Sequence, residues 1–244
     1  MKASKKTRQY YIASLLLRLV VFVLLTVYAV RLPERFSADL AVGPTGLAHP
    51  TVLTVAWLGL MLSMLFRFFP SALESLGCQK EFAGRFVPSG TAPPSAERQS
   101  AAKGALRVLL AWLALNGLFF FAHWKGWVGD LFMVCLAAFY SVCDIICILF
   151  FCPFQSWMMH NRCCTTCRIY NWDFMMISTP LLCVSGVLAT SACVVAAILL
   201  LRWELTYLRH KERFFESSNT ALRCSQCQEQ LCRYKRKLSG KYRT

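Results

Sequence analysis

Long apolar stretches recur along this chain and limit, more than any other feature, how it folds. A helix needs about 20 apolar residues to cross the hydrocarbon core of a bilayer. The chain is 57% hydrophobic and only 16% charged, whereas an average soluble domain carries about 25% charged residues. The sequence therefore predicts an all-α integral membrane bundle with about five hydrophobic segments, at residues 10–30, 51–69, 104–122, 131–152 and 174–201.

The stretches between these segments divide the chain into two expected units. Residues 1–152 hold the first four hydrophobic segments and a loop at 71–103, which we expect to be flexible because it is rich in Pro, Ser and Ala. Residues 153–244 hold a cysteine-bearing loop, the last hydrophobic segment and a basic C-terminal tail. The first segment follows a basic tail, as in a signal peptide, but it is longer than a signal sequence requires, so we expect a retained helix.

Basic residues are concentrated in the N-terminal tail, the second-to-third connection, the fourth-to-fifth loop and the C-terminal tail. These four regions hold 23 Lys and Arg, against 3 in the other two connections. Such an excess is typical of cytoplasmic loops and favours contact with anionic headgroups. The sequence therefore predicts a multi-pass protein of the cell membrane with a cytoplasmic N-terminus, and nucleic acid is not the expected partner.

For the last hydrophobic segment, the distribution of basic residues and the length of the segment favour different topologies. Placing all four basic regions on one side requires residues 174–201 to enter and leave by the same face. A straight helix of these 28 residues would be about 42 Å long, against a hydrocarbon core of about 30 Å. The sequence leaves two alternatives: one tilted or overlong pass, or a re-entrant hairpin broken around Pro180 or Ser185–Gly186.

Cysteines form two clusters outside the apolar segments. Each contains a C-x-x-C pair, a spacing that lets two sulfurs meet on one metal ion. The first choice of ligands for zinc or an iron–sulfur cluster is Cys164, Cys167, Cys224 and Cys227, with Cys163 and Cys232 as substitutes. Three other hypotheses remain open: redox-active dithiols, a palmitoylated group at Cys152, Cys163 and Cys164, or unligated thiols in a reducing cytosol.

A few polar residues fall inside the hydrophobic segments. Asp144 lies in the middle of the fourth segment, where a carboxylate is costly and indicates a functional site or a hydrogen-bonded packing residue. Asn116 on the neighbouring third segment is the expected partner. Arg18 lies near the basic tail, and we expect it to extend its side chain back toward the membrane surface.

The stretches CPFQSWMMHNRCCTTCRIYNWDFMMISTPL and RWELTYLRHKERFFESSNTALRCSQCQEQLC carry the one family resemblance of the chain. They resemble an uncharacterised family of bacterial multi-pass membrane proteins with an NRCC-x-x-C-R-I-x-N-W loop and a C-terminal C-x-x-C-x4-C segment. The resemblance covers residues 153–232 and implies that both cysteine segments belong to one module. It implies no reaction.

Three functions remain as hypotheses from the sequence. The first is a membrane protein with a cysteine site on its cytoplasmic face that binds metal in a structural or redox role. The second is a metal-free scaffold or assembly protein with other proteins as partners, and the third is a small transporter using Asp144. The sequence contains no phosphate-binding loop, H-E-x-x-H motif or nucleophile elbow, which disfavours an enzyme of those classes.

Overall fold

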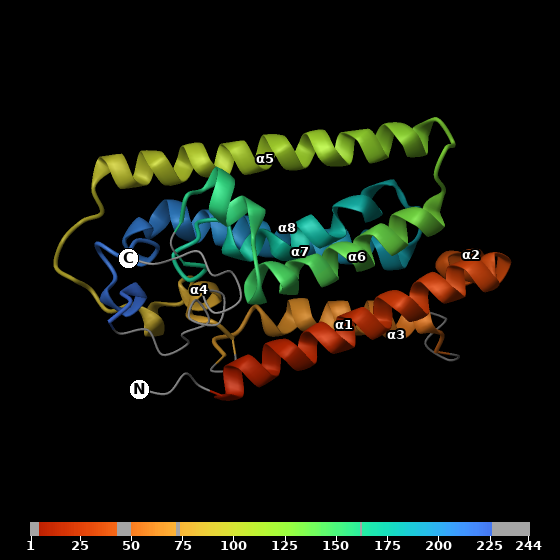
Figure 1. Ribbon diagram of the computed structural model, residues 1–244, viewed down its shortest axis with the longest axis horizontal. Coiled ribbons are helices and arrows are strands. Elements are labelled where there is room, and N and C mark those ends of the chain that lie inside the picture. The colour runs from red at the N-terminus through yellow and green to blue at the C-terminus, as the bar shows by residue number, and fades with distance from the viewer. Residues whose placement is uncertain (1–4, 43–49, 72–73, 162, 226–244) are drawn as a thin grey trace.

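The computed structural model describes residues 5–42, 50–71, 74–161 and 163–225. These residues form a helical bundle without a named strand, which confirms the all-α prediction (Figure 1). The longer helices are α1 (Lys5–Arg31), α2 (Pro33–Val42), α3 (Val52–Phe66), α5 (Ser95–Trp124), α6 (Asp130–Leu149) and α8 (Val187–Arg209). The short helices are α4 (Leu76–Gln79), η2 (Ala83–Arg85), η3 (Phe154–Met158), η4 (Tyr170–Trp172), α7 (Asp173–Ser178), η5 (Thr179–Cys183), η6 (Lys211–Arg213) and η7 (Thr220–Leu222).

Four helices in the described part of the chain, α1, α5, α6 and α8, are long and apolar enough to cross a membrane. The chain is therefore a polytopic membrane protein. The shorter α3 lies within the same bundle and is apolar throughout. Helix α5 has 30 residues, which corresponds to about 45 Å and exceeds the hydrocarbon core by about 15 Å.

Long helices that follow one another run in opposite directions, so the connections gather at two ends (Figure 1). One end, here called the basic end, collects the start of α1, residues 67–71 and 74–94, residues 150–161 and 163–172, and the chain from the end of α8 to residue 225. The opposite end carries α2 and the α5–α6 connection, where Arg31, Arg35 and Lys125 lie. Within the described residues, the four basic regions therefore share one end, as the charge pattern indicates.

The last hydrophobic segment follows the hairpin alternative. Helices α7 and η5 lead away from the basic end, the chain turns at Ser185–Gly186, and α8 returns (Figure 1). The two arms pack together, and the thiol of Cys193 on α8 donates to the carbonyl of Ser178 at 3.4 Å. The outgoing arm covers about 29 Å by the ideal rise of its α-helical, 3₁₀ and extended parts. Its length therefore matches the apolar thickness, and the chain after α8 begins at the basic end.

Gly186 makes this turn possible. Its φ is +132°, and a Cβ there would lie 2.8 Å from the carbonyl oxygen of Leu40 on α2. We expect Gly186→Ala to lower the free energy of unfolding by about 1–3 kcal/mol, because a side chain both strains the backbone and collides with another helix. Thermal unfolding in detergent, followed by tryptophan fluorescence, measures the loss. Gly117→Ala is the matched control, because a Cβ at Gly117 has no atom within 4 Å; equal melting temperatures for the two variants would contradict the prediction.

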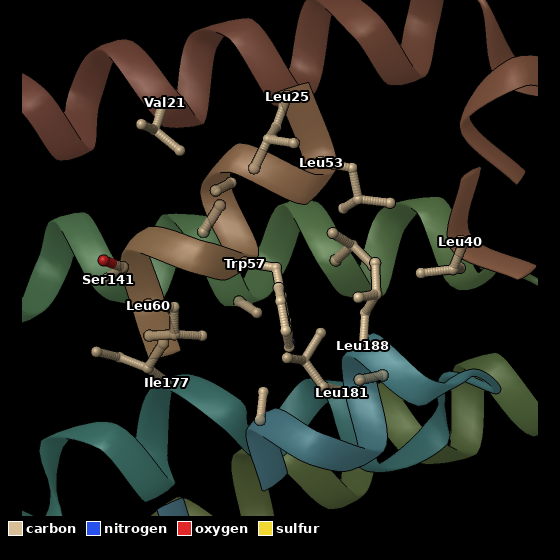
Figure 2. A pocket seen from close by; sticks show the side chains of 16 residues that line it. Val21, Leu25, Leu40, Leu53, Trp57, Leu60, Ser141, Ile177, Leu181 and Leu188 are labelled. Carbon is tan, nitrogen blue, oxygen red and sulfur yellow. The ribbon is translucent and has the colours of Figure 1, made fainter. Parts of the chain in front are cut away.

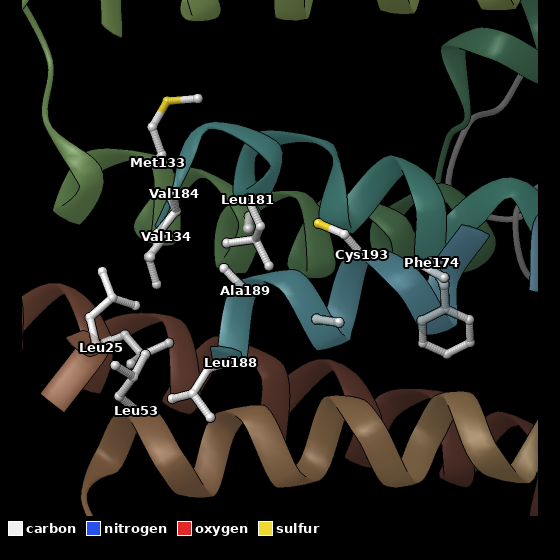
Figure 3. Close-up of a cluster of buried hydrophobic side chains, with 14 of the residues drawn as sticks. Leu25, Leu53, Met133, Val134, Phe174, Leu181, Val184, Leu188, Ala189 and Cys193 are labelled. Atoms are coloured by element: carbon white, nitrogen blue, oxygen red, sulfur yellow. The ribbon is translucent and has the colours of Figure 1, made fainter. Parts of the chain in front are cut away.

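The bundle core is built where α1, α3, α6 and the hairpin meet. Figure 3 shows its side chains, among them Leu25, Leu53, Val134 and Leu188, pointing into one layer between these helices. A cavity of about 110 Å³ lies within the core and is lined almost entirely by aliphatic side chains, with Ser141 as a polar exception (Figure 2). Because such a lining offers a ligand almost no polar contact, this cavity indicates no binding chemistry.

The loop expected to be flexible is in part a folded cap. The third hydrophobic helix begins at Ser95, nine residues before the expected start at Gly104. Residues 75 and 77–81 are buried, and Ser89 donates hydrogen bonds from its amide to Ser218 and from its hydroxyl to the carbonyl of Ser217. The segment has no hydrophobic pattern and is rich in Pro, Ser and Ala, so its sequence indicated a linker. It is held in place instead by polar contacts with the chain after α8.

Candidate functional site: a cavity lined by cysteines

The cysteine loop begins where Pro153 follows the end of α6. A single π-helical turn over Phe154–Met158 leads into the loop. Cys164-Thr165-Thr166-Cys167 then forms a β-turn, in which the amide of Cys167 donates to the carbonyl of Cys164 at 2.9 Å. The thiol of Cys164 donates to Oε1 of Gln155 at 3.0 Å. The turn therefore brings the ends of the first C-x-x-C pair together and ties one of them to the π-helical segment.

Contacts with α8 hold the second half of this loop. Arg168 forms a two-pronged ion pair with Glu204, with Nη1 at 2.8 Å from Oε1. The indole of Trp172 donates to the same carboxylate at 2.7 Å, and the indole of Trp203 donates to the carbonyl of Arg168 at 3.0 Å. The position of the C-x-x-C turn therefore depends on the hairpin that returns α8 to this end.

A cavity of about 370 Å³, here called the thiol cavity, lies between α5, α6, α7 and the cysteine loop. Its walls are mainly apolar and aromatic, and Asp144, Gln155 and Asp173 are among its few polar side chains. The cysteines that line it come from α6 and the loop: Cys143, Cys147, Cys152, Cys164 and Cys167. Cys164 and Cys167 therefore face the same largely apolar space as two thiols from the membrane-spanning helix.

Cys167 and its neighbour Lys80 are both almost completely buried. Burial raises the pKa of the Cys167 thiol, and the cationic Lys80 opposes only part of that change. The ammonium of Lys80 donates to the carbonyl of Cys167 at 2.8 Å and lies 5.6 Å from the ring centroids of Trp203 and Phe214. Burial lowers the pKa of Lys80 to about 8. Cys167 thus stays a thiol near neutral pH, and Cys164 is the more accessible of the pair.

The predicted metal ligands are not brought together in the part of the chain that the structure describes. Those residues contain no group of three or more His, Cys, Asp or Glu side chains that could hold a metal ion. Cys224 is exposed, whereas Cys167 is buried beside the thiol cavity. The other two members of the second cluster, Cys227 and Cys232, lie outside the described residues. Cys163 lies within the loop, with its sulfur 3.1 Å from Oγ1 of Thr165.

Asp144 has a different partner from the one expected. Nη1 of Arg18 lies 2.8 Å from Oδ2 of Asp144 and also donates to the carbonyl of Ser141 at 2.8 Å. The expectation that Arg18 extends toward the surface is therefore wrong, because α1 packs against α6 and offers it a carboxylate. Asn116 instead donates to the carbonyl of Trp112 at 3.0 Å and accepts from the hydroxyl of Tyr140 at 3.5 Å. Tyr140 lies one helical turn before Asp144.

Sequence reasoning missed a second buried group, centred on Arg67 at the end of α3. Its guanidinium lies 3.1 Å from Glu74 and 3.0 Å from Asp173, and it donates to the side chain of Asn171 and to the sulfur of Cys78, both at 2.8 Å. Burial alone would lower the pKa of Arg67, but the nearby Asp173, Cys78 and Glu74 hold it well above its usual value. The sequence offers only a weak signal for this group. Residues 74–81 contain acidic, amide and basic side chains close together, but they show no periodicity that would predict their burial.

No protein-family model matches this chain, and neither a search of curated proteins nor one of solved structures finds a match. The resemblance noted for residues 153–232 therefore stays a prediction, and the candidate site rests on geometry alone.

Proposed function

We propose that the protein is a membrane-embedded thiol–disulfide exchange protein in which Cys164 and Cys167 alternate between two thiols and one disulfide. One observation carries this proposal: both cysteines end the same hydrogen-bonded turn and line the same cavity. The first and fourth residues of a β-turn have Cα atoms less than 7 Å apart. A disulfide usually joins Cα atoms 4.4–6.8 Å apart, so the turn suits a reversible bond.

The proposed reaction is the reduction of a substrate disulfide by the two thiols of Cys164 and Cys167. The thiolate of Cys164 attacks one substrate sulfur, which forms a mixed disulfide and releases the first substrate thiolate. Cys167 then loses its proton and attacks the sulfur of Cys164, so the second substrate thiolate leaves and the Cys164–Cys167 disulfide remains. The substrate disulfide takes up two electrons, and its two thiolates take up two protons from the medium or the cysteines. Cys164 attacks first because it is more accessible, while burial keeps Cys167 protonated.

Two further features support the direction of exchange and the kind of substrate. The site lies at the basic end, which the charge pattern predicts to face the reducing cytoplasm, so the resting pair would be dithiol and would act as reductant. The thiol cavity is mainly apolar and aromatic, and therefore favours a disulfide that carries an apolar group.

Redox titration of the protein in phospholipid vesicles tests the proposal. Glutathione buffers set the potential, a maleimide reagent traps remaining thiols, and peptide mass spectrometry locates the disulfide. We expect a Cys164–Cys167 bond in the wild type and in the control Cys193→Ser, whose cysteine packs between the arms of the hairpin. Cys164→Ser and Cys167→Ala should abolish the bond while their melting temperatures stay close to that of the wild type.

Two results would contradict the proposal. One is that Cys164 and Cys167 remain two thiols at every potential of the titration, although the wild-type protein is folded and melts at the same temperature as the variants. The other is stoichiometric zinc that protects Cys164 and Cys224 together from the maleimide, which would favour the metal site predicted from the sequence. The metal site remains a physical alternative because the hairpin returns α8 to the end of the bundle that holds the cysteine loop, so the chain after α8 begins there.

A further inference from the structure

We infer that a groove beside the last turns of α8 binds the headgroup of an anionic phospholipid, independently of the thiol cavity. The groove has a volume of about 430 Å³ and is formed by α8, by the residues that follow it and by Glu81 of the cap. It lies at the basic end, where α8 leaves the apolar part of the bundle (Figure 1).

The charges that line the groove favour an anion. Three arginines face it, Arg202, Arg209 and Arg213, against the one carboxylate of Glu81. Glu81 is already engaged, because its side chain pairs with Arg202 and its carbonyl accepts from Arg213 at 3.0 Å. His210, which also lines the groove, lies 3.3 Å from Glu212. The remaining positive charge therefore comes from Arg209, which is exposed, and from Arg213.

Arg213 presents a donor that the folded chain leaves unused. Its Nε atom is buried and has no hydrogen-bond partner among the described residues. A buried donor without a partner costs free energy. Because Arg213 lines the groove, a small rotation of its side chain would let a phosphate oxygen recover that cost through a charge-assisted hydrogen bond. The guanidinium also suits phosphate because its donors lie in one plane.

The apolar side of the groove indicates a lipid rather than a free phosphate ion. Ile198, Leu201 and Leu205 line it and are 48%, 61% and 48% exposed. They lie three or four residues apart, so they form one stripe along α8 that continues from the groove toward the apolar part of the bundle. Acyl chains would pack on this stripe while the phosphate contacts the arginines, an arrangement typical of basic pockets at the membrane surface.

Lipid-dependent stabilisation of the detergent-solubilised protein tests this inference. Phosphatidylglycerol, phosphatidylcholine or inorganic phosphate is titrated in, and the shift in melting temperature gives the apparent affinity. We expect phosphatidylglycerol to bind more tightly than phosphatidylcholine, and inorganic phosphate at the same concentration to give no shift. Arg209→Gln together with Arg213→Gln should weaken phosphatidylglycerol binding about 30-fold, from the usual contribution of two basic residues at an anionic surface.

Matched variants separate binding from folding. Arg223→Gln removes an exposed arginine that does not line the groove and should leave the affinity unchanged. If Arg213→Gln fails to fold, Arg209→Gln alone and the conservative Arg213→Lys measure the same site. Equal affinities for the two lipids, or an unchanged affinity in Arg209→Gln, would overturn the inference. An equal shift with inorganic phosphate would show a simple anion site and overturn it as well.

Discussion

Replacing Arg67 by methionine is expected to be among the most destabilising single substitutions in this protein. The change keeps most of the apolar stem but removes the cation that lies between Glu74 and Asp173. Both carboxylates would then be left in a buried site without their common partner, which typically costs about 3–5 kcal/mol. Thermal or denaturant unfolding measures the loss. Arg85→Met, which removes an exposed arginine of the same cap, is the control and should have almost no effect.

The pH dependence of the Arg67→Met variant gives a second check with a definite sign. Burial already raises the pKa of Glu74, while Arg67 opposes that change. Without Arg67 the pKa of Glu74 in the folded state rises further above its value in the unfolded state. At a pH between these two pKa values, the folded state therefore binds more protons than the unfolded state. Stability therefore falls as pH rises through this range, and the variant should approach the wild type as pH is lowered. A loss of stability that does not change with pH would contradict the proposed charge balance.

Removal of either member of the Arg18–Asp144 pair should have the second large effect. A single substitution would leave the other side chain as an unpaired charge inside the membrane-spanning bundle, at a cost of about 2.5–3.5 kcal/mol for a central position. We expect Arg18→Leu and Asp144→Leu each to lower the stability by about that amount. The double variant should recover most of the loss, because an apolar pair leaves no unpaired charge.

A double-mutant cycle in detergent measures the coupling of this pair. Losses that simply add in the double variant would show that the two side chains act independently, contrary to their 2.8 Å contact. The same cycle bears on the transporter hypothesis. A folded double variant with the stability of the wild type would show that Asp144 stabilises the packing of α1 on α6, and the same variant in vesicles would test the transport role by solute flux.

The sequence predicted the number and position of the hydrophobic segments because apolar length is a local property. Local hydropathy could not decide between one overlong pass and a re-entrant hairpin over residues 174–201. The break depends on Gly186, whose positive φ and close approach to the carbonyl of Leu40 on α2 both exclude a side chain, and a contact with another helix cannot be read from local hydropathy. The charge distribution was the better guide here, since a long-range property of the whole chain constrains topology where local hydropathy does not.

The Arg18–Asp144 pair was missed although a signal was present. Arg18 lies eight residues into the first hydrophobic segment, and Asp144 lies eight residues before the end of the fourth. In antiparallel helices these positions have the same depth, so matching depths of opposite charges would have predicted the contact. The cap around Arg67 offered no comparable signal, because its burial depends on Asn171 and Asp173, which lie more than 100 residues along the chain.

The extra length of α5 makes it a rigid spacer at the membrane surface. Its first turns extend beyond the hydrocarbon layer, and Glu97 there accepts a hydrogen bond from the hydroxyl of Ser217. The segment after α8 is thereby fastened at a fixed height of roughly 10–15 Å above the acyl chains. This platform therefore stands in the aqueous phase, while the groove on α8 remains at headgroup level below it.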